Sequence, residues 1–447
     1  MNSTSQQAPP GASAASADAI SPMAKKALLS STVGAMLEWY EFFIYGLAAA
    51  LVFGPQFFPS DDPTTGRLLS LSTFAIAFVA RPIGGIVFGH LGDRIGRKAT
   101  LIVTLSMMGG ATVVIGLLPT YAMVGIWAPI LLVVVRLIQG LSLGGEFAGS
   151  ILMGVEYGGA KRRGLFGGIV NSGLAWGLLL ANLTFLAVSL LPTDAFDSWG
   201  WRIPFLLSGI LLFVGLFIRL SVAESPEFQQ VKDTGTVEKA PVVQVLQRHW
   251  RAILSAMACF LCAGSVFYVA TVFSISYATT NLGLTRASVL SAVLVATACM
   301  GFSIPAFGAL SDRIGRRTVF VGSSVAMGIT PFLWFASLGT GSWFVMLLGF
   351  LSVLIPYAAC AGVIGTFFAD AFEPRIRYTG VALGYGAGSV LASISPIVAT
   401  QLIADSDRWV SVAIALAVTS VVSVLGGLTL PQIDSISSPS GDKSASH

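Results

Sequence analysis

Long apolar stretches recur along the chain, separated by short polar segments. Runs of about 20 apolar residues are typical of helices that span a membrane. The pattern predicts twelve spans, with a longer polar segment at 223–250 between the sixth and the seventh. The spans lie near 28–53, 67–90, 99–119, 128–155, 165–191, 202–222, 252–279, 287–309, 318–338, 344–369, 380–404 and 409–430. We therefore expect an all-α membrane protein built from two six-helix bundles.

The same pattern divides the chain into five parts. We expect bundles at 25–222 and 251–430, joined by a cytosolic linker over 223–250. Residues 1–24 are rich in Ala, Ser and Pro and lack the basic and apolar regions of a signal peptide, so a disordered cytosolic tail is expected there. A second cytosolic tail is expected over 431–447.

Composition excludes several classes of protein. Of the 447 residues, 55% are hydrophobic and 10% are charged, whereas a soluble globular protein carries roughly 25% charged residues. Metal, nucleotide and covalent-nucleophile motifs are absent from the sequence. Cys259 and Cys262 form a C-x-x-C inside an apolar run without a second pair, so we expect them to pack in the core rather than bind a metal. Neither an enzyme nor a cofactor is expected.

The distribution of Lys and Arg predicts the orientation in the membrane. Basic residues concentrate in the loops on the side that holds both termini. The loops of the other side contain only Arg67, Arg202, Arg286 and Arg408. Because cytoplasmic loops carry an excess of Lys and Arg, we expect both termini to lie in the cytosol.

A decapeptide occurs twice. The loop after the second span reads GHLGDRIGRK, from Gly89 to Lys98, and the loop after the eighth span reads GALSDRIGRR, from Gly308 to Arg317. Two copies at equivalent places in two six-span halves indicate a duplicated fold. Parallel repeats of this kind form transporters whose binding site lies between the halves near the bilayer midplane.

The first copy contains small residues at helical spacing. Gly85, Gly89 and Asp93 are four residues apart and share one helix face, which lets a neighbouring helix approach closely. Asp93 could then accept hydrogen bonds from helix N-termini or from an arginine of the same motif. Such contacts would hold the cytosolic side shut. The alternative is that the cations of the motif only set the topology.

The sequence resembles the major facilitator superfamily, and within it the metabolite:proton symporters. The resemblance extends over nearly all of the folded chain. It rests on EWYEFFIYG (38–46), FVARPIGGIVFGHLGDRIGRK (78–98), RLIQGLSLGGEFAG (136–149), SWGWRIPFLLS (198–208), AESPEF (223–228), DRIGRR (312–317) and EPRIRYTG (373–380). It implies a gating role for the repeated loops, carried by Gly89, Asp93, Arg94, Gly96, Arg97, Asp312, Arg313 and Arg316.

Five charged residues lie deep within predicted spans, away from the span ends, where charge is costly and usually functional. They are Glu38, Glu41, Arg81, Arg136 and Glu146. All five belong to the first half. The equivalent positions of the second half hold Met257, Phe260, Met300, Ile355 and Gly365. We infer that the charge chemistry belongs to the first half.

Arg81 lies near the middle of its span. A guanidinium there must face a cavity or a carboxylate, so Arg81 either contacts an anionic substrate group or forms a structural ion pair with Glu38 or Glu41. Glu38 and Glu41 are three residues apart on one helix face. Two carboxylates in a low-dielectric site do not both ionise, so at least one is expected to carry the coupled proton. The alternative is that one of them only pairs with Arg81 or Arg136.

The other two buried charges are each open to two interpretations. Arg136 begins R-L-I-Q-G, which resembles the superfamily signature linked to proton translocation, but a snorkelling arginine is also consistent with its position. Glu146 is a gate or relay in the inner half, or a structural tie to the basic loop Lys161–Arg163.

Further candidates are weaker. Tyr45, Asn171, Tyr268 and Tyr385 are candidate substrate contacts, although tyrosines in spans more often serve packing. The loop after the tenth span holds further charges that form a latch of the second half or only set topology. They are Asp370, Glu373, Arg375 and Arg377.

The predicted function is proton-coupled import of a small organic acid across the cytoplasmic membrane by alternating access. An uncoupled uniporter and a carrier of a zwitterion such as betaine or proline are the alternatives. The expected partners are the substrate, protons and the lipid bilayer, with no nucleic acid, and we expect a monomer driven by the proton gradient.

Overall fold

The computed structural model describes residues 21–60, 63–406 and 408–433. These residues form helices almost throughout, and none of them belongs to a β-strand. Within these residues, ten helices have the length and hydropathy of a membrane span. α1 (Pro22–Leu51) and α3 (Pro63–Arg94), 30 and 32 residues long, complete the predicted twelve. A helix of 30 residues is about 45 Å long, enough to cross a hydrocarbon core of about 30 Å.

The predicted tails fall mostly outside the described residues. One part of the prediction is wrong, because the disordered tail was expected to reach residue 24 whereas α1 begins at Pro22. The side chain of Ser21 accepts a hydrogen bond from the amide of Ala24 at 3.1 Å, and Pro22 stands in the first helical turn. Both features are typical of a helix start.

Six spans form the first half. Its long helices are α1, α3, α4 (Arg97–Leu117), α6 (Trp127–Tyr157), α7 (Gly159–Asn171) followed by α8 (Gly173–Ser189), and α10 (Ile203–Leu220). Short elements connect them: α2 (Phe53–Phe57), α5 (Tyr121–Val124), α9 (Thr193–Ser198) and the 3-10 turn η1 (Gly200–Arg202).

The second half repeats this arrangement. Its seventh span consists of α13 (Trp250–Tyr268), the π-helical segment η2 (Val269–Phe273) and α14 (Ser274–Thr280). The remaining spans are α15 (Arg286–Ile314), α16 (Arg316–Leu338), α17 (Trp343–Ala369), α18 (Arg377–Ser393) followed by α19 (Ser395–Ser406), and α20 (Trp409–Thr429). The linker is not an irregular segment, because it folds into α11 (Pro226–Asp233) and α12 (Pro241–Arg248).

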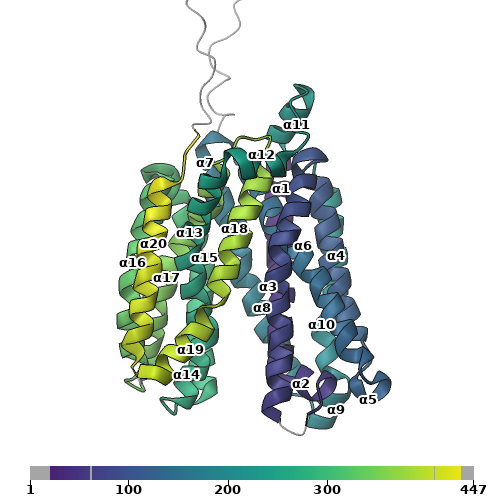
Figure 1. The fold of residues 1–447 in the computed structure, drawn as a ribbon, viewed down its shortest axis with the longest axis vertical. Coiled ribbons are helices and arrows are strands. Elements are labelled where there is room, and N and C mark those ends of the chain that lie inside the picture. The colour runs from purple at the N-terminus through teal and green to yellow at the C-terminus, as the bar shows by residue number, and fades with distance from the viewer. Residues whose placement is uncertain (1–20, 61–62, 407, 434–447) are drawn as a thin grey trace, which may run out of the picture.

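The two halves stand side by side (Figure 1). The two repeated loops, α11 and α12 lie at one end of the bundle, which we call the motif end. α2, α5, α9 and α14 lie at the opposite end. The ribbons of the halves converge toward the motif end and draw apart toward the opposite end (Figure 1).

Glycines allow the halves to approach at the motif end. A Cβ added to Gly89 of α3 would lie 3.0 Å from the Cα of Thr379 on α18, which leaves no room for a larger residue. A Cβ added to Gly168 of α7 would likewise come within 3.0 Å of the carbonyl oxygen of Ile304 on α15. The predicted close approach of a helix to the face of α3 is confirmed, and α7 and α15 make the equivalent contact.

Candidate functional site

A small cavity lies between the halves, with room for about one water molecule. The first half contributes Phe147, Asn171 and Leu174, and the second half contributes Phe260, Ala263, Tyr357, Ala361, Ile364 and Tyr385. The ring of Tyr385 stacks on Phe147 with 3.5 Å between the ring centroids and lies against Phe260 at 4.6 Å. Aromatic side chains from both halves therefore close around the cavity.

An ion pair lies next to Tyr385, one of the residues that line this cavity. Nη2 of Arg81 on α3 lies 3.0 Å from Oε1 of Glu38 on α1, and each side chain is 2% exposed. The guanidinium also lies 4.9 Å from the ring centroid of Tyr385, a cavity-lining residue. Nε of Arg81 and Oε2 of Glu38 have no hydrogen-bond partner in the described part of the chain. Arg81 thus meets Glu38 rather than Glu41, and it retains an unused donor beside the cavity.

Glu41 belongs to a second buried site. Its Oε2 accepts a hydrogen bond from the hydroxyl of Thr112 at 2.8 Å, and that hydroxyl accepts one from Nε2 of Gln139 at 2.7 Å. Oε1 of Gln139 accepts in turn from Nη1 of Arg136 at 3.0 Å. The Arg136 guanidinium lies over the ring of Tyr45 at 3.7 Å. Arg136 is therefore not a snorkelling residue, since it is 1% exposed and turned inward.

Glu146 forms a third buried site, also inside the first half. Its Oε1 accepts from Nη1 of Arg219 on α10 at 2.8 Å, and its carboxylate also accepts from the hydroxyls of Thr104 and Ser150. The alternative partner proposed from the sequence, the basic loop Lys161–Arg163, is wrong. Arg219 looked like a loop residue because it ends its span, but it is 2% exposed and turns back into the bundle.

The repeated loops hold the motif end together reciprocally. Asp93 on α3 accepts hydrogen bonds from the backbone amides of Tyr378 at 3.1 Å and Thr379 at 2.9 Å, in the first turn of α18. Asp312 on α15 accepts from the amides of Gly164 and Leu165 on α7 at 2.8 and 2.9 Å. Each carboxylate meets the amides of a helix of the other half, an arrangement that favours negative charge.

Tyr378 reaches across the boundary between the halves. It is fully buried, and its hydroxyl donates to the carbonyl of Gly145 on α6 at 2.8 Å. Gly92 and Gly149 leave the space for it, because a Cβ on Gly92 would overlap the Tyr378 ring and one on Gly149 would overlap its hydroxyl. This role could not be predicted from the sequence, because a tyrosine near a helix start resembles a residue of the membrane interface.

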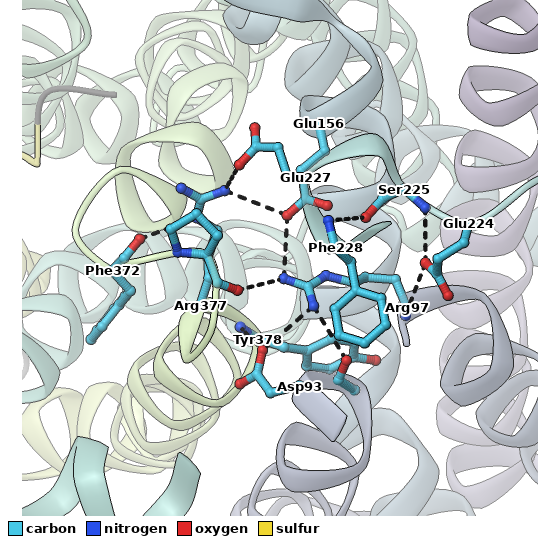
Figure 2. Close-up of polar contacts among 12 residues, drawn as sticks. Asp93, Arg97, Glu156, Glu224, Ser225, Glu227, Phe228, Phe372, Arg377 and Tyr378 are labelled. Carbon is cyan, nitrogen blue, oxygen red and sulfur yellow. Dashed lines mark hydrogen bonds and ion pairs between the residues drawn. The ribbon is translucent and has the colours of Figure 1, made fainter. Parts of the chain in front are cut away.

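A cluster of charges surrounds the first loop (Figure 2). Arg97 lies 3.7 Å from Asp93 and 3.5 Å from Glu156, and it donates to the carbonyl of Pro374 at 2.8 Å. Arg377 lies 3.5 Å from the same oxygen of Glu156 and pairs with Glu227 of α11. Arginines of both halves therefore share Glu156, which makes the cluster continuous across the boundary.

Glu227 receives two arginines. Nη1 of Arg163 lies 2.5 Å from its Oε1, and Arg377 pairs with its other oxygen. Burial alone would raise the pKa of the Glu227 carboxyl, but Arg377 and Arg163 outweigh burial and lower that pKa below its ordinary value. Arg163 also lies 3.6 Å from Asp370, which pairs with Arg316 of the second loop. The linker thus contributes an anion that ties the two loops together.

Glu224, also in the linker, caps the start of α4. Its carboxylate accepts from the amides of Arg97 at 3.1 Å and Lys98 at 3.3 Å. Gly96 precedes them with a φ of 111°, a conformation that favours glycine. The ring of Phe228 lies 4.7 Å from the Arg97 guanidinium (Figure 2). The linker therefore packs directly on the first loop.

The remaining candidates lie in different places. Asn171 donates to the carbonyl of Ala361 at 2.6 Å across the cavity, and Tyr268 is buried with its ring 5.8 Å from that of Phe78. Tyr45 lies beneath Arg136 rather than at the cavity, with its hydroxyl 2.6 Å from that of Thr73. Arg94 and Arg313 are exposed and outside the charge cluster.

The sequence predicts most basic residues in the loops or at the span ends of one side, and the structure adds that several of those at the motif end are buried. The structure buries Arg97, Arg163, Arg219 and Arg377 at 0, 6, 2 and 3% exposure. Each is paired with a carboxylate, which offsets the cost of burial. Cys259 and Cys262 are buried, and the described residues contain no group of three or more His, Cys, Asp or Glu that could hold a metal ion.

Both halves of the chain match known transporter families. The family described as "Sugar (and other) transporter" matches residues 27–248, and "Major Facilitator Superfamily" matches residues 256–444. The inner membrane metabolite transport protein YhjE of Escherichia coli (strain K12) is 40% identical over 413 residues, covering 91% of this chain and 92% of that protein. The shikimate transporter of the same organism is 38% identical, with 91% and 94% covered.

Two further similarities extend the comparison. The proline/betaine transporter of Salmonella typhimurium (strain LT2) is 31% identical, covering 91% of this chain and 83% of that protein. Among solved structures, the proton:xylose symporter XylE bound to 6-bromo-6-deoxy-D-glucose superposes with a TM-score of 0.73 at 18% identity, covering 93% of this chain and 97% of that chain.

Proposed function

Because this chain belongs to the major facilitator superfamily, we propose that it imports a small organic acid together with protons. The families and relatives that it matches are transporters and not enzymes. The protein is a membrane protein with many apolar helices. We place it in the cytoplasmic membrane with the motif end and both termini in the cytosol, since the loops at that end carry most of the basic residues.

The observation that carries this proposal is the Arg81–Glu38 pair beside the cavity between the halves. Arg81 is a permanently charged group at the boundary that a moving substrate would cross. Its guanidinium suits a carboxylate, and one of its donors is unused. A substrate carboxylate would therefore find a cation whose carboxylate partner among the described residues is Glu38.

The same pair supplies a route to proton coupling. When a substrate carboxylate takes Arg81, Glu38 loses its partner in a dry site and is stabilised by binding a proton. Glu41, held by Thr112, is the second carboxylate able to carry the proton. Two carboxylates in the first half, one paired with Arg81 and one bonded to Thr112, support import of an anion with at least one proton.

The contacts at the motif end support a gate. Asp93 and Asp312 hold helices of the opposite half, and the charge cluster reinforces them. With these contacts made, access to the cavity would come from the opposite end. Breaking them would allow the halves to rock and expose the cavity to the cytosol, which is the alternating-access cycle.

A zwitterionic substrate is the second candidate. The rings of Phe147, Phe260 and Tyr385 surround the cavity next to Arg81. Aromatic faces bind quaternary ammonium groups, and one relative is named a proline/betaine transporter. A substrate with both a carboxylate and an ammonium group would use Arg81 and the rings together.

Uptake measurements test the proposal. Cells producing the protein would be given labelled dicarboxylates, shikimate-like acids, citrate and betaines, with and without a protonophore at matched expression. We expect an organic acid to accumulate and the protonophore to abolish accumulation. Uptake that resists the protonophore would indicate a uniporter, and uptake of betaines alone would indicate the zwitterion carrier. If no compound is moved in a protonophore-sensitive way, the proposal is wrong.

A further inference from the structure

Four side chains form a continuous buried chain of hydrogen bonds from Arg136 to Glu41. The donor–acceptor distances are 3.0 Å from Arg136 to Gln139, 2.7 Å from Gln139 to Thr112 and 2.8 Å from Thr112 to Glu41. Arg136, Gln139, Thr112 and Glu41 are each at most 2% exposed. Arg136 and Gln139 belong to α6, Thr112 to α4 and Glu41 to α1, so the chain connects three helices of the first half.

The chemistry of these groups fixes the direction of each bond. Arginine has donors and no acceptor, so Gln139 must turn its carbonyl oxygen toward Arg136. Its amide nitrogen, a donor, then faces Thr112. The Thr112 oxygen accepts this bond, and its one proton remains for a further acceptor. Arg136 thus sets the orientation of Gln139, and Gln139 in turn constrains the Thr112 hydroxyl.

The Thr112 hydroxyl has two acceptors within reach. Oε2 of Glu41 lies at 2.8 Å and the carbonyl oxygen of Met108 at 2.9 Å. One proton can serve only one of them at a time. With Glu41 ionised, the hydroxyl donates to the carboxylate. With Glu41 protonated, the hydroxyl can turn to Met108 and accept the new O–H of Glu41, while Gln139 and Arg136 stay in place.

We propose that Thr112 and Gln139 are positioning residues that let Glu41 bind and release the coupled proton inside the dry first half. The inference rests on the proposed proton-coupled function and adds two residues to it. A hydronium ion from the aqueous phase transfers its proton to Oε2 of Glu41: one O–H bond of the hydronium breaks, one O–H bond forms on Glu41, and water is released. The Thr112 hydroxyl then rotates toward the carbonyl oxygen of Met108. Each of the four side chains keeps at least one hydrogen bond in both protonation states, which limits the cost of burying polar groups.

Other charges near Glu41 are already engaged. Glu38, one turn away on α1, pairs with Arg81 of α3. Glu146 of α6 pairs with Arg219 of α10. α8, which also packs against α1, contains no titratable residue. Two tyrosines of α1 are engaged as well. The ring of Tyr45 lies against the Arg136 guanidinium, and the hydroxyl of Tyr40 donates to the carbonyl of Pro204 at 2.8 Å. The described surroundings of Glu41 therefore leave Thr112 as its hydrogen-bond donor.

The test uses a matched pair of substitutions at one position. Thr112→Ser keeps the hydroxyl, whereas Thr112→Val keeps the shape and removes it. Gln139→Leu interrupts the chain one step further away. Ser106→Ala is the control, because Ser106 lies on the same helix and its hydroxyl donates only to the backbone of Ile102. Purified proteins would be compared for helix content and thermal unfolding first, so that misfolded variants are recognised.

Two readouts separate this inference from the proposed function. In proteoliposomes with an imposed pH gradient, Thr112→Val and Gln139→Leu should lower gradient-driven uptake by roughly tenfold or more, as expected for losing a bond to a charged group. Thr112→Ser and Ser106→Ala should retain it. Infrared pH titration of the Glu41 carboxyl band, assigned with Glu41→Gln, reports the proton without any substrate, and its midpoint should move in Thr112→Val.

The outcomes are distinct. An unchanged carboxyl titration and unchanged gradient-driven uptake in Thr112→Val would overturn the inference while leaving proton coupling intact. A shifted titration in a protein that moves no acid under any gradient would instead overturn the proposed function, whereas the positioning of Glu41 by Thr112 and Gln139 would stand. A loss of uptake in Thr112→Ser equal to that in Thr112→Val would also overturn the inference, because the hydroxyl would then not be the feature that matters.

Discussion

The carboxylate of Asp93 accepts a hydrogen bond from the backbone amide of Thr379 at 2.9 Å. One side chain of the first half thereby holds the first turn of α18 in the second half. The bond joins residues that are far apart in the sequence, and it lies where the two halves meet.

Replacing this carboxylate should loosen the gate without unfolding the protein. We expect Asp93→Asn to insert normally and to lower uptake, because the amide keeps the shape but loses the charge that the amides of α18 favour. Labelling of single cysteines at the motif end should show increased accessibility. Asp312→Asn should act in the same direction through α7. Uptake at the normal level in Asp93→Asn would contradict the gating role.

Two substitutions at the cavity distinguish a functional ion pair from a structural one. Arg81→Ala leaves Glu38 buried without its ion-pair partner and should lower the free energy of unfolding by about 3–5 kcal/mol. Combining Arg81→Met with Glu38→Leu should restore most of that stability, since an apolar pair of similar size is tolerated, but should not restore uptake. Thermal unfolding and uptake of the single and double variants would be compared. Transport by the double variant would show that the pair is only structural.

Glu38→Gln should separate binding from coupling. The amide is uncharged, so Arg81 stays available to a substrate carboxylate while no proton can be gained or lost. We expect exchange of labelled for unlabelled substrate across proteoliposomes to persist, and accumulation driven by a pH gradient to disappear. If Glu38→Gln still accumulates substrate against its gradient, the coupled proton resides elsewhere, and Glu41 is the remaining buried candidate.

The ion pairs of Glu227 should stabilise the protein near neutral pH and cease to do so in acid. Its pKa is lowered from an ordinary value of 4.5 because Arg377 and Arg163 outweigh burial. A lowered pKa in the folded state stabilises the fold above the ordinary value and ceases to do so as the pH falls through the lowered value. The melting temperature of Glu227→Gln should therefore lie below that of the unaltered protein near neutral pH, and the two should converge in acid.

Glu373 serves as the control for Glu227. Glu373 pairs with Arg375 at the same end, but both side chains are about 40% exposed. Glu373→Gln should change the melting temperature little, as expected for an exposed ion pair. A constant difference between Glu227→Gln and the unaltered protein across the whole pH range would show that Glu227 does not act through its charge.

Two glycines test the contact made by Tyr378. A methyl group at Gly149 would overlap the Tyr378 hydroxyl, whereas one at Gly110 would meet nothing within 4 Å. We expect Gly149→Ala to displace Tyr378 and favour opening of the motif end, and Gly110→Ala to leave it closed. Cysteine labelling at the motif end measures the difference. Equal labelling of the two variants would argue against Tyr378 as a contact that holds the halves together.

The architecture could be predicted from the sequence because the architecture depends on periodic features of the chain. Apolar runs revealed the spans, and the spacing of Gly85, Gly89 and Asp93 revealed the face of α3 that meets α18. The prediction that Asp93 meets a helix N-terminus and an arginine of its own motif is confirmed. Which helix supplies the amides could not be predicted, because any residue has a backbone amide. The same reasoning assigned five buried charges but could not pair them, since pairing depends on how helices rotate against one another.

Other parts of the site were missed for physical reasons. Arg219 ends a span, where an arginine ordinarily reaches toward the membrane surface, so its inward turn to Glu146 left no trace in the sequence. Glu227 lies in a polar linker that resembled a solvated connection. Thr112 and Gln139 are uncharged, and their importance follows only from the distances that join them to Glu41 and Arg136.

The reciprocal contacts of Asp93 and Asp312 bear on how such a molecule could originate. Each half supplies one carboxylate and one pair of helix amides to the other, which is the pattern of a two-fold symmetric dimer interface. A single ancestral six-helix unit associating with a copy of itself would have formed both contacts at once. Arg81, Arg136 and Glu41 have no counterparts in the second half, so they mark where fusion of the two copies later allowed one of them to specialise.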